Sequence, residues 1–291
     1  MGGINIFLYL LYQIFSFTIR IIPDRLRYLI GIALGNLVFY GIKKRREIGI
    51  NNLKMAFPEL SDQAARELTK KSCHHLGLSL VEFTMLSHVK KEDLLNNIHI
   101  ENKDILDQAL TGGQGIIIYT AHFGNWELLG VDLALQGYSL HVLAQTQNNP
   151  YFNDRINQIR ELAGMRLIPL GMSVRGAFKV LKNREILCIA GDQNAGTMGW
   201  SVNFFGRTTP TYPGAVQLAV RTGAVIVPAY IIREGWRCHR IKIYQPYAIK
   251  KSATEKEQHQ LLQELTSLSE EVIREYPEQW LWLHRRWKNS G

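Results

Sequence analysis

Residues 116–130 read IIIYTAHFGNWELLG, and they carry the signals that decide the fold. The apolar run before Ala121 is typical of a strand buried on both faces, as in parallel sheets covered by helices. Asn125 is a good N-cap, so a helix is predicted to follow it. His122 then lies in the strand-to-helix turn, and Glu127 lies in the first helical turn. Open α/β sheets bind ligands at the carboxyl ends of their strands, so this turn marks a candidate site.

Short apolar runs alternate with helical stretches from residue 115 onward. Strands are predicted at 115–121, 139–145, 166–170, 185–191 and 224–232, and helices at 125–136, 151–163, 173–183, 213–222 and 254–275. This alternation favours an α/β fold with a central mixed, mostly parallel sheet covered by helices. Residues 240–249 alternate polar and apolar side chains, which is typical of an edge or antiparallel strand. The sequence shows no long linker or internal repeat, so the body is interpreted as a single domain.

Residues 4–22 form a second informative segment, because only Gln13 and Arg20 in this run are strongly polar. The run is nearly long enough to span a membrane. A retained anchor is favoured over a signal peptide, since no basic region precedes the run and bulky residues continue throughout it. An interfacial helix and a helix docked on the domain itself are the alternatives, because residues 28–42 form a second apolar stretch. Residues 1–42 are therefore predicted to be N-terminal membrane anchor or interfacial helices, and residues 43–291 the main domain.

The balance of charge indicates an anionic partner. The 291 residues include 34 Lys+Arg against 25 Asp+Glu, which gives a formal net charge of +9. Cations cluster after the apolar segment, in Arg20, Arg25, Arg27 and the KKRR of residues 43–46, and the positive-inside rule then places the body on the cytoplasmic side. Nucleic acid is not an expected partner, because the sequence has no recognition motif or basic stripe outside the presumed membrane-facing ends. The three cysteines are scattered, which indicates neither a disulfide framework nor a zinc site.

His122 and Glu127 can act as a base with an orienting acid. The helix dipole favours the Glu127 carboxylate, and the turn can bring it to Nδ1 of His122 while Nε2 faces the strand ends. Such a pair can remove the proton from a hydroxyl as that hydroxyl attacks an acyl carbonyl. The alternative is that His122 only caps the turn, because an isolated H-x-x-x-x-E spacing often arises by chance. Competing signatures are missing from the sequence, which has no G-x-S-x-G elbow and no H-E-x-x-H motif.

Five segments together resemble the lysophospholipid acyltransferase superfamily, specifically its lipid A biosynthesis branch of lauroyl and myristoyl acyltransferases. They are AHFGNWE (121–127), GDQNAG (191–196), FFGRTTPTYPG (204–214), VPAY (227–230) and PEQWLWLHRRWK (277–288). The resemblance implies a glycerol-phosphate acyltransferase-like fold. It also implies an enzyme that moves a fatty acyl chain from acyl carrier protein to a hydroxyl of a lipid A precursor, at the cytoplasmic face of the inner membrane. His122 would be its base and Glu127 the partner of that base. We expect no metal and no cofactor beyond an acyl carrier protein or CoA thioester.

The candidate substrate-binding residues are polar side chains near the predicted strand ends. Arginines on the helix after the second strand suit phosphate recognition of an anionic glycolipid acceptor, with a solvated surface as the alternative. The aspartate and glutamine after the 185–191 strand are acceptor-binding candidates, with a solvated turn as the alternative. The set is Asn125, Gln145, Asn149, Arg155, Arg160, Asp192 and Gln193. Gln145 stands where the family often has an arginine, which puts phosphate recognition at that position in doubt.

Two aromatic segments complete the expectations. FFG at 204–206 is predicted to wall the acyl pocket, with core packing as the alternative, and the aromatic and cationic residues of 280–288 are predicted to face a membrane. Two other functions fit the same residues. One is an acyl-CoA-dependent acyltransferase of another glycolipid or phospholipid, and the other is a non-catalytic membrane lipid-binding protein.

Overall fold

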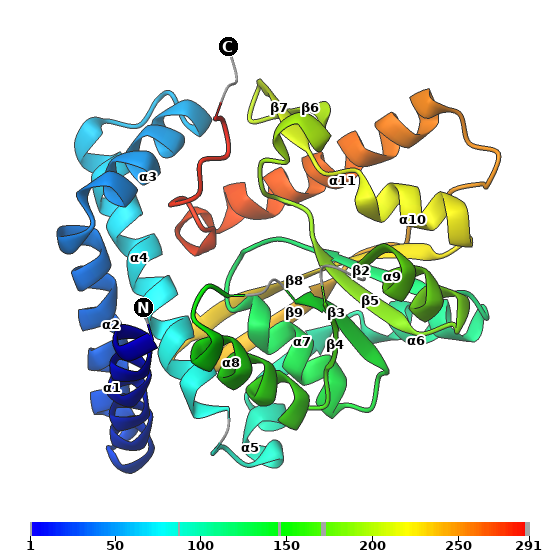
Figure 1. The fold of residues 1–291 in the computed structure, drawn as a ribbon. Coiled ribbons are helices and arrows are strands. Elements are labelled where there is room, and N and C mark those ends of the chain that lie inside the picture. Colours follow the sequence, from blue (N-terminus) through cyan, green and yellow to red (C-terminus); the bar gives the residue numbers. More distant parts are fainter. Residues whose placement is uncertain (1, 87, 145–146, 170–172, 289–291) are drawn as a thin grey trace.

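The structure is a computed structural model that describes residues 2–86, 88–144, 147–169 and 173–288. A seven-stranded sheet forms its centre, with the strand order β1-β9-β8-β2-β5-β3-β4 (Figure 1). The strands are β1 (Ile98–Glu101), β2 (Ile116–Thr120), β3 (Leu140–Ala144), β4 (Arg166–Pro169), β5 (Ile186–Ala190), β8 (Val225–Gly235) and β9 (Cys238–Ile243). All neighbouring pairs are parallel except β8 with β9. The predicted mixed, mostly parallel sheet is therefore confirmed.

Helices cover both faces of the sheet, which is why β2 is apolar at every position. Ile116 and Ile118 pack in a core with α6 (Lys103–Thr111) and α7 (Trp126–Leu135). Ile117 and Tyr119 point the other way, into a core with three further helices. Those helices are α9 (Ser173–Lys182), α10 (Gly214–Thr222) and α11 (Glu255–Glu275). A strand between two such layers buries both of its faces.

Other parts of the chain departed from the sequence-based expectations. Residues 240–249 were predicted to form an edge or an antiparallel strand. The antiparallel alternative is confirmed, because β9 pairs antiparallel with β8. The edge alternative is wrong, because β1 pairs with the other side of β9. β1 itself and the hairpin of β6 (Trp200–Phe204) and β7 (Arg207–Thr211) were not predicted. The remaining elements are α5 (Lys91–Asn96), α8 (Pro150–Leu162) and the short 3₁₀ turns η2 (Gly196–Met198) and η3 (Pro277–Gln279).

Four helices stand together beside the sheet, namely α1 (Gly2–Ile21), α2 (Asp24–Gly41), α3 (Lys43–Ala56) and α4 (Asp62–Met85) (Figure 1). Glycines let α2 and α4 pack backbone to backbone. A Cβ on Gly77 would lie 2.2 Å from the carbonyl oxygen of Gly31, and one on Gly35 would lie 2.6 Å from that of Cys73. The predicted boundary after residue 42 coincides with the 92° bend between α2 and α3.

The N-terminal helix α1 leaves most of its apolar side chains in the open. Within the described residues, no single helix is both long and apolar enough to cross a membrane. By length and composition, α2 and α3 together pass that test as a pair bent by 92°. The exposed apolar side chains of α1 are Ile6, Phe7, Leu8, Leu10, Leu11, Ile14, Phe17 and Ile21. Large apolar side chains exposed together on one helix are typical of an interaction site.

The segment after α11 is part of the core, so the prediction that residues 280–288 face a membrane is wrong. Trp280, Trp282 and Trp287 are all buried. They pack in one cluster with Phe204 and Phe205, which supports the core-packing alternative for the 204–206 segment. Figure 1 shows this segment, in red, passing between α3 and α11. Its composition resembles an interfacial belt, but its position in the fold buries the tryptophans and Arg286, while Arg285 and Lys288 are exposed.

Candidate active site

The turn between β2 and α7 is held in one conformation by backbone geometry and a cap. Asn125 accepts a hydrogen bond from the backbone N–H of Leu128 through Oδ1 at 3.4 Å, as expected of an N-cap. Gly124 has φ 57°, in the left-handed region. A Cβ at this position would lie 1.9 Å from the carbonyl oxygen of Ile231 on β8. The glycine therefore serves the close approach of a neighbouring strand.

His122 projects from this turn and is bound by a carboxylate from the end of β5. Its Nδ1 lies 2.8 Å from Oδ1 of Asp192. The backbone N–H of His122 donates to Oδ2 of the same carboxylate at 3.0 Å. The indole N–H of Trp280 also donates to Oδ2, at 2.8 Å. Asp192 is 5% exposed, so all of these contacts are made inside the protein.

The contacts of His122 assign a role to each of its ring nitrogens. With Asp192 as acceptor, Nδ1 carries the proton, and Nε2 is left as the basic nitrogen. The side-chain nitrogen of Gln193 lies 3.3 Å from Nε2 and can donate to it. Burial lowers the pKa of His122, but the charge and hydrogen bond of Asp192 and the charge of Glu127 outweigh it, so the net pKa is raised. Burial opposes ionisation of Asp192, yet His122 and Trp280 bring its pKa down to about 2.

Glu127 has a different partner from the one predicted. The expected contact between its carboxylate and Nδ1 of His122 is wrong, because Asp192 occupies that nitrogen. Instead, Arg160 on α8 donates to Glu127 from Nε at 2.9 Å and from Nη2 at 2.6 Å. This is a two-point pairing between a planar guanidinium and a carboxylate. Glu127 therefore acts on His122 through its charge and holds Arg160 in place.

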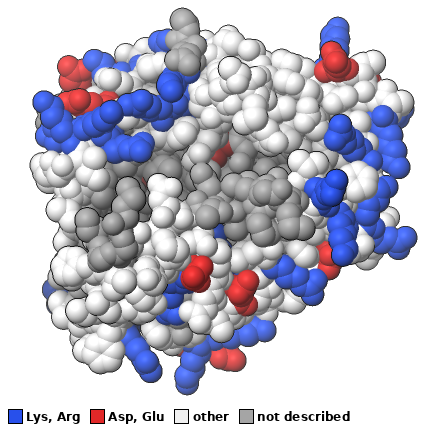
Figure 2. Space-filling model, in the orientation of Figure 1, with Lys and Arg blue, Asp and Glu red and all other residues white. Residues whose placement is uncertain are grey.

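A cavity of about 520 Å³ opens in front of Nε2. Its polar lining includes His122, Glu127, Arg160, Gln193 and Arg221. Its apolar lining comes from β3, β5, α9 and α10, through Leu143, Ile189, Val174, Ala177 and Leu218. These elements lie right of the centre in Figure 1, and Figure 2 shows the same face hollowed near its centre, with Lys and Arg gathered toward its margins. A cleft with one reactive nitrogen and an apolar wall suits a substrate with a long apolar chain.

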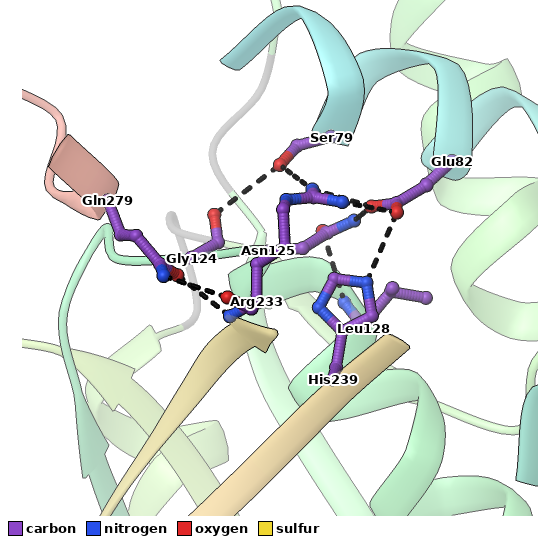
Figure 3. A network of polar contacts seen from close by, with 8 residues as sticks. All are labelled: Ser79, Glu82, Gly124, Asn125, Leu128, Arg233, His239 and Gln279. Carbon is purple, nitrogen blue, oxygen red and sulfur yellow. Dashed lines mark hydrogen bonds and ion pairs between the residues drawn. The ribbon is translucent and has the colours of Figure 1, made fainter. Parts of the chain in front are cut away.

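Behind the turn lies a buried ion-pair network that ties the turn to three other elements (Figure 3). Arg233 on β8 donates to the two carboxylate oxygens of Glu82 on α4, at 2.5 Å and 2.7 Å. Nε2 of His239 on β9 lies 3.1 Å from the same carboxylate. The side-chain amide of Asn125 also donates to it, at 2.7 Å. Sequence reasoning missed this network, because its members are far apart in the chain and form no local motif.

Gln279 completes the attachment of the turn. Its side-chain amide exchanges two hydrogen bonds with the backbone of Arg233, at 2.7 Å and 3.0 Å. Its own carbonyl oxygen accepts from the N–H of Gly124 at 2.9 Å. Ser79 on α4 donates to the carbonyl oxygen of Gly124 at 3.4 Å. The turn that carries His122 is thus connected to α4, β8 and the segment after α11.

The structure brings four of the predicted site residues to the cavity and places three others elsewhere. His122, Glu127, Arg160 and Gln193 line it, and Asp192 lies directly behind His122. Asn125 is buried beneath the turn. Asn149 caps α8 and donates to the carbonyl oxygen of Asn5 on α1 at 3.3 Å. Arg155 does not line this cavity; it donates to Gln158 at 2.8 Å, and its charge lowers the pKa of His88. Gln145 lies outside the described residues.

Trp280 is a site residue that sequence reasoning assigned to the wrong environment. The signal for it was the WLWLHRRW composition, which was interpreted as membrane-facing. Its hydrogen bond to Asp192 depends on a contact across 88 residues of sequence. A pattern search along the chain does not detect such a contact.

Acyltransferases of bacterial lipids are among the proteins to which this chain is similar in sequence. A phosphatidylinositol mannoside acyltransferase of Mycobacterium tuberculosis is 30% identical over 154 residues, or 52% of this chain and 48% of that protein. This chain thus matches about half the length of that relative. The lipid A biosynthesis palmitoleoyltransferase of Escherichia coli is 25% identical over 268 residues, or 89% of this chain and 84% of that protein. The crystal structure of a 1-acyl-glycerophosphate acyltransferase from Thermotoga maritima aligns with 86% of this chain and 97% of its own, with 18% identity and a TM-score of 0.38.

The decisive comparison is with a family model. Residues 4–289, nearly the whole chain, match the model described as bacterial lipid A biosynthesis acyltransferase. The protein therefore belongs to the bacterial lipid A biosynthesis acyltransferase family.

Proposed function

We propose that this protein is an O-acyltransferase that moves a fatty acyl chain from an acyl carrier protein thioester to a hydroxyl of a lipid A precursor. The observation that carries the proposal is the His122–Asp192 pair, whose basic nitrogen faces a cavity with an apolar wall. Membership of the family supports the reaction class. The proposed reaction uses no metal and no cofactor beyond the thioester.

His122 is the proposed general base. Its Nε2 takes the proton of the acceptor hydroxyl as the hydroxyl oxygen attacks the thioester carbonyl carbon. The resulting imidazolium is stabilised by the Asp192 carboxylate, which accepts from Nδ1 at 2.8 Å. Collapse of the tetrahedral intermediate breaks the carbon–sulfur bond, and the proton on Nε2 passes to the leaving thiolate. The products are an ester and a thiol, so atoms and charge balance.

The rest of the cavity is assigned by its chemistry. The apolar wall formed by Leu143, Val174 and Leu218 suits the acyl chain. Arg160, fixed by Glu127, and Arg221 suit anionic groups of the glycolipid acceptor. Glu127 is thus a positioning residue: it holds Arg160, and its charge raises the pKa of His122.

The proposed location is the cytoplasmic face of the inner membrane. The exposed apolar face of α1 supports an interfacial attachment. The cations of residues 43–46 after it support contact with an anionic leaflet.

The test compares His122→Ala with His99→Ala, a matched change at an exposed histidine on β1. Purified protein is assayed for acyl transfer from acyl carrier protein to a lipid A precursor. His122→Ala is expected to lower kcat by about 10²-fold or more, because the general base is lost. His99→Ala is expected to keep the wild-type rate. If His122→Ala retained the rate of the control, the proposed base would be wrong. A wild-type protein that bound the lipid but transferred no acyl chain would instead favour the non-catalytic lipid-binding role.

A second candidate function has its own support in the comparison with the mycobacterial enzyme. That relative is named for phosphatidylinositol mannoside, which makes another glycolipid the alternative acceptor. The alternative donor is acyl-CoA, because the same base can act on any acyl thioester. The two donors should be compared at equal concentration on both acceptors. Mass spectrometry of lipid extracts from cells with and without the protein then identifies the acylated lipid.

A further inference from the structure

A second cavity, of about 240 Å³, lies where the α1–α2 junction meets the end of α4 and the β8–β9 turn. Its polar lining consists of Arg20, Arg27, His88, Lys90, Asp93 and Arg237. It shares no lining residue with the cavity in front of His122. The structure thus contains a basic pocket that the proposed reaction does not use.

Part of this pocket is rigid. Arg27 donates to the carbonyl oxygens of Ile19 and Arg20, at 2.7 Å and 2.9 Å, which closes the turn between the two helices. Asp24 pairs with Arg27 at 2.8 Å and with Arg237 at 2.9 Å. One carboxylate therefore holds two guanidinium groups from different elements at the edge of the pocket.

Asp93 is a second carboxylate in the pocket lining, but no ion pair joins it to the remaining cations in the described residues. Across the described residues, the structure gives the side chains of Arg20 and Lys90 no hydrogen-bond or ion-pair partner. Partial burial, Arg20 and Arg155 all lower the pKa of His88, so positive groups crowd one another here. An anion in the pocket would relieve that repulsion.

The surroundings of the pocket indicate where such an anion would come from. Phe17 and Ile21 on α1 and Leu26 on α2 flank Arg20 in sequence, and they are 61%, 65% and 46% exposed. An interfacial helix buries such side chains among lipid tails and keeps its cations at the level of the headgroups. Free phosphate would need no apolar surface beside its site.

We propose that this pocket binds the phosphate of an anionic phospholipid headgroup and so fixes how the protein sits on the membrane. The inference rests on the membrane location proposed above. Arg20 and Lys90 supply the free donors, and Arg27 and Arg237 form the preset wall. The site would hold the cavity of His122 in a constant orientation to the bilayer surface.

The test is co-sedimentation of the full chain with vesicles of phosphatidylcholine, with or without phosphatidylglycerol. The double variant Arg20→Gln/Lys90→Gln is compared with Arg25→Gln/Lys91→Gln, which removes the same charge from adjacent residues that do not line the pocket. The pocket variant should lose about ten-fold more affinity for the phosphatidylglycerol vesicles than the control variant. The reason is that specific charge-assisted contacts exceed the general attraction of a surface charge. Equal losses in the two variants would overturn the proposal.

Two further arms separate the alternatives. Inorganic phosphate is added at constant ionic strength. Two results together would make free phosphate the ligand and the lipid assignment wrong. The first is that phosphate raises the Tm of the wild type but not of the pocket variant. The second is that both double variants bind the vesicles equally. A wild-type protein that bound no vesicle would contradict the membrane location and this site together. Partition is measured without acyl transfer, so failure of the proposed reaction is a separate result.

Discussion

Replacing Glu82 with glutamine is expected to lower the free energy of unfolding by about 3–5 kcal/mol, because the charge of Arg233 then stays buried without its ion-pair partner. Both side chains are 4% exposed, so solvent cannot compensate the loss. For a chain of this size, the change corresponds to a fall in Tm of roughly 6–20 °C. The measurement is thermal unfolding followed by circular dichroism at pH 7 and a fixed scan rate.

The matched control is Asp62→Asn. Asp62 pairs with Lys54, but the two side chains are 84% and 46% exposed, so the pair contributes about 0–1 kcal/mol. Replacing Arg233 with methionine in the Glu82→Gln background should recover part of the loss, because the double change removes the unpaired charge. A Tm of Glu82→Gln within the range of the control would refute the reasoning.

The same ion pair predicts a dependence on pH. Burial opposes ionisation of Glu82, but Arg233 and His239 outweigh it and lower the pKa to about 2. The unfolded chain therefore binds a proton at higher pH than the folded one does, and the contribution of Glu82 is complete above its ordinary pKa. The Tm difference between wild type and Glu82→Gln should shrink as the pH falls from about 5 toward 2. A difference that stayed constant over this range would contradict the assigned ionisation.

Three further predictions concern the turn and the cavity. In steady-state assays, Asp192→Asn should lower kcat more than Glu127→Gln does, because Asp192 holds Nδ1 of His122. A larger loss of kcat in Glu127→Gln would restore Glu127 as the direct partner of His122. Asp192→Asn should also shift the acid limb of the pH–rate profile to lower pH, since Asp192 raises the pKa of His122 and the base must be neutral to act. An acid limb at the wild-type pH would mean that this limb does not report the titration of His122. Gly124→Ala should prevent normal folding of the turn, because its φ of 57° and the carbonyl oxygen of Ile231 leave no room for a Cβ; wild-type Tm and activity in this variant would contradict that packing.

The elements that sequence patterns predicted well are those whose surroundings are uniform. β2 is buried at every position and β5 at most of its positions, so each produces an apolar run that predicts a buried strand. α11 begins at a capping box formed by Thr254 and Glu257, which is a local signal in the sequence. Such elements are set by residues close together in the chain, and period and capping rules detect them.

The parts that could not be predicted depend on contacts between distant segments. The spacing from His122 to Glu127 suggested that they pair, but the direction of the turn gives Nδ1 to Asp192, 70 residues away. Trp280 and Trp282 have the composition of a membrane belt, and only the fold shows that they are buried. β1 has four residues and is defined mainly by its pairing with β9. In each case the deciding partner is absent from the local sequence.

The hydrogen bond from Trp280 to Asp192 has a consequence for the order of events during synthesis. The strands β2 and β5, with His122 and Asp192, leave the ribosome well before residues 277–288 do. Until that segment packs between α3 and α11, Asp192 lacks the hydrogen bond from the Trp280 indole, and Gly124 lacks its hydrogen bond to Gln279. A nascent chain therefore carries its histidine and aspartate early but acquires their final alignment late. Premature termination before this segment would yield a protein that contains His122 and Asp192 but lacks the hydrogen bonds from Trp280 and to Gln279.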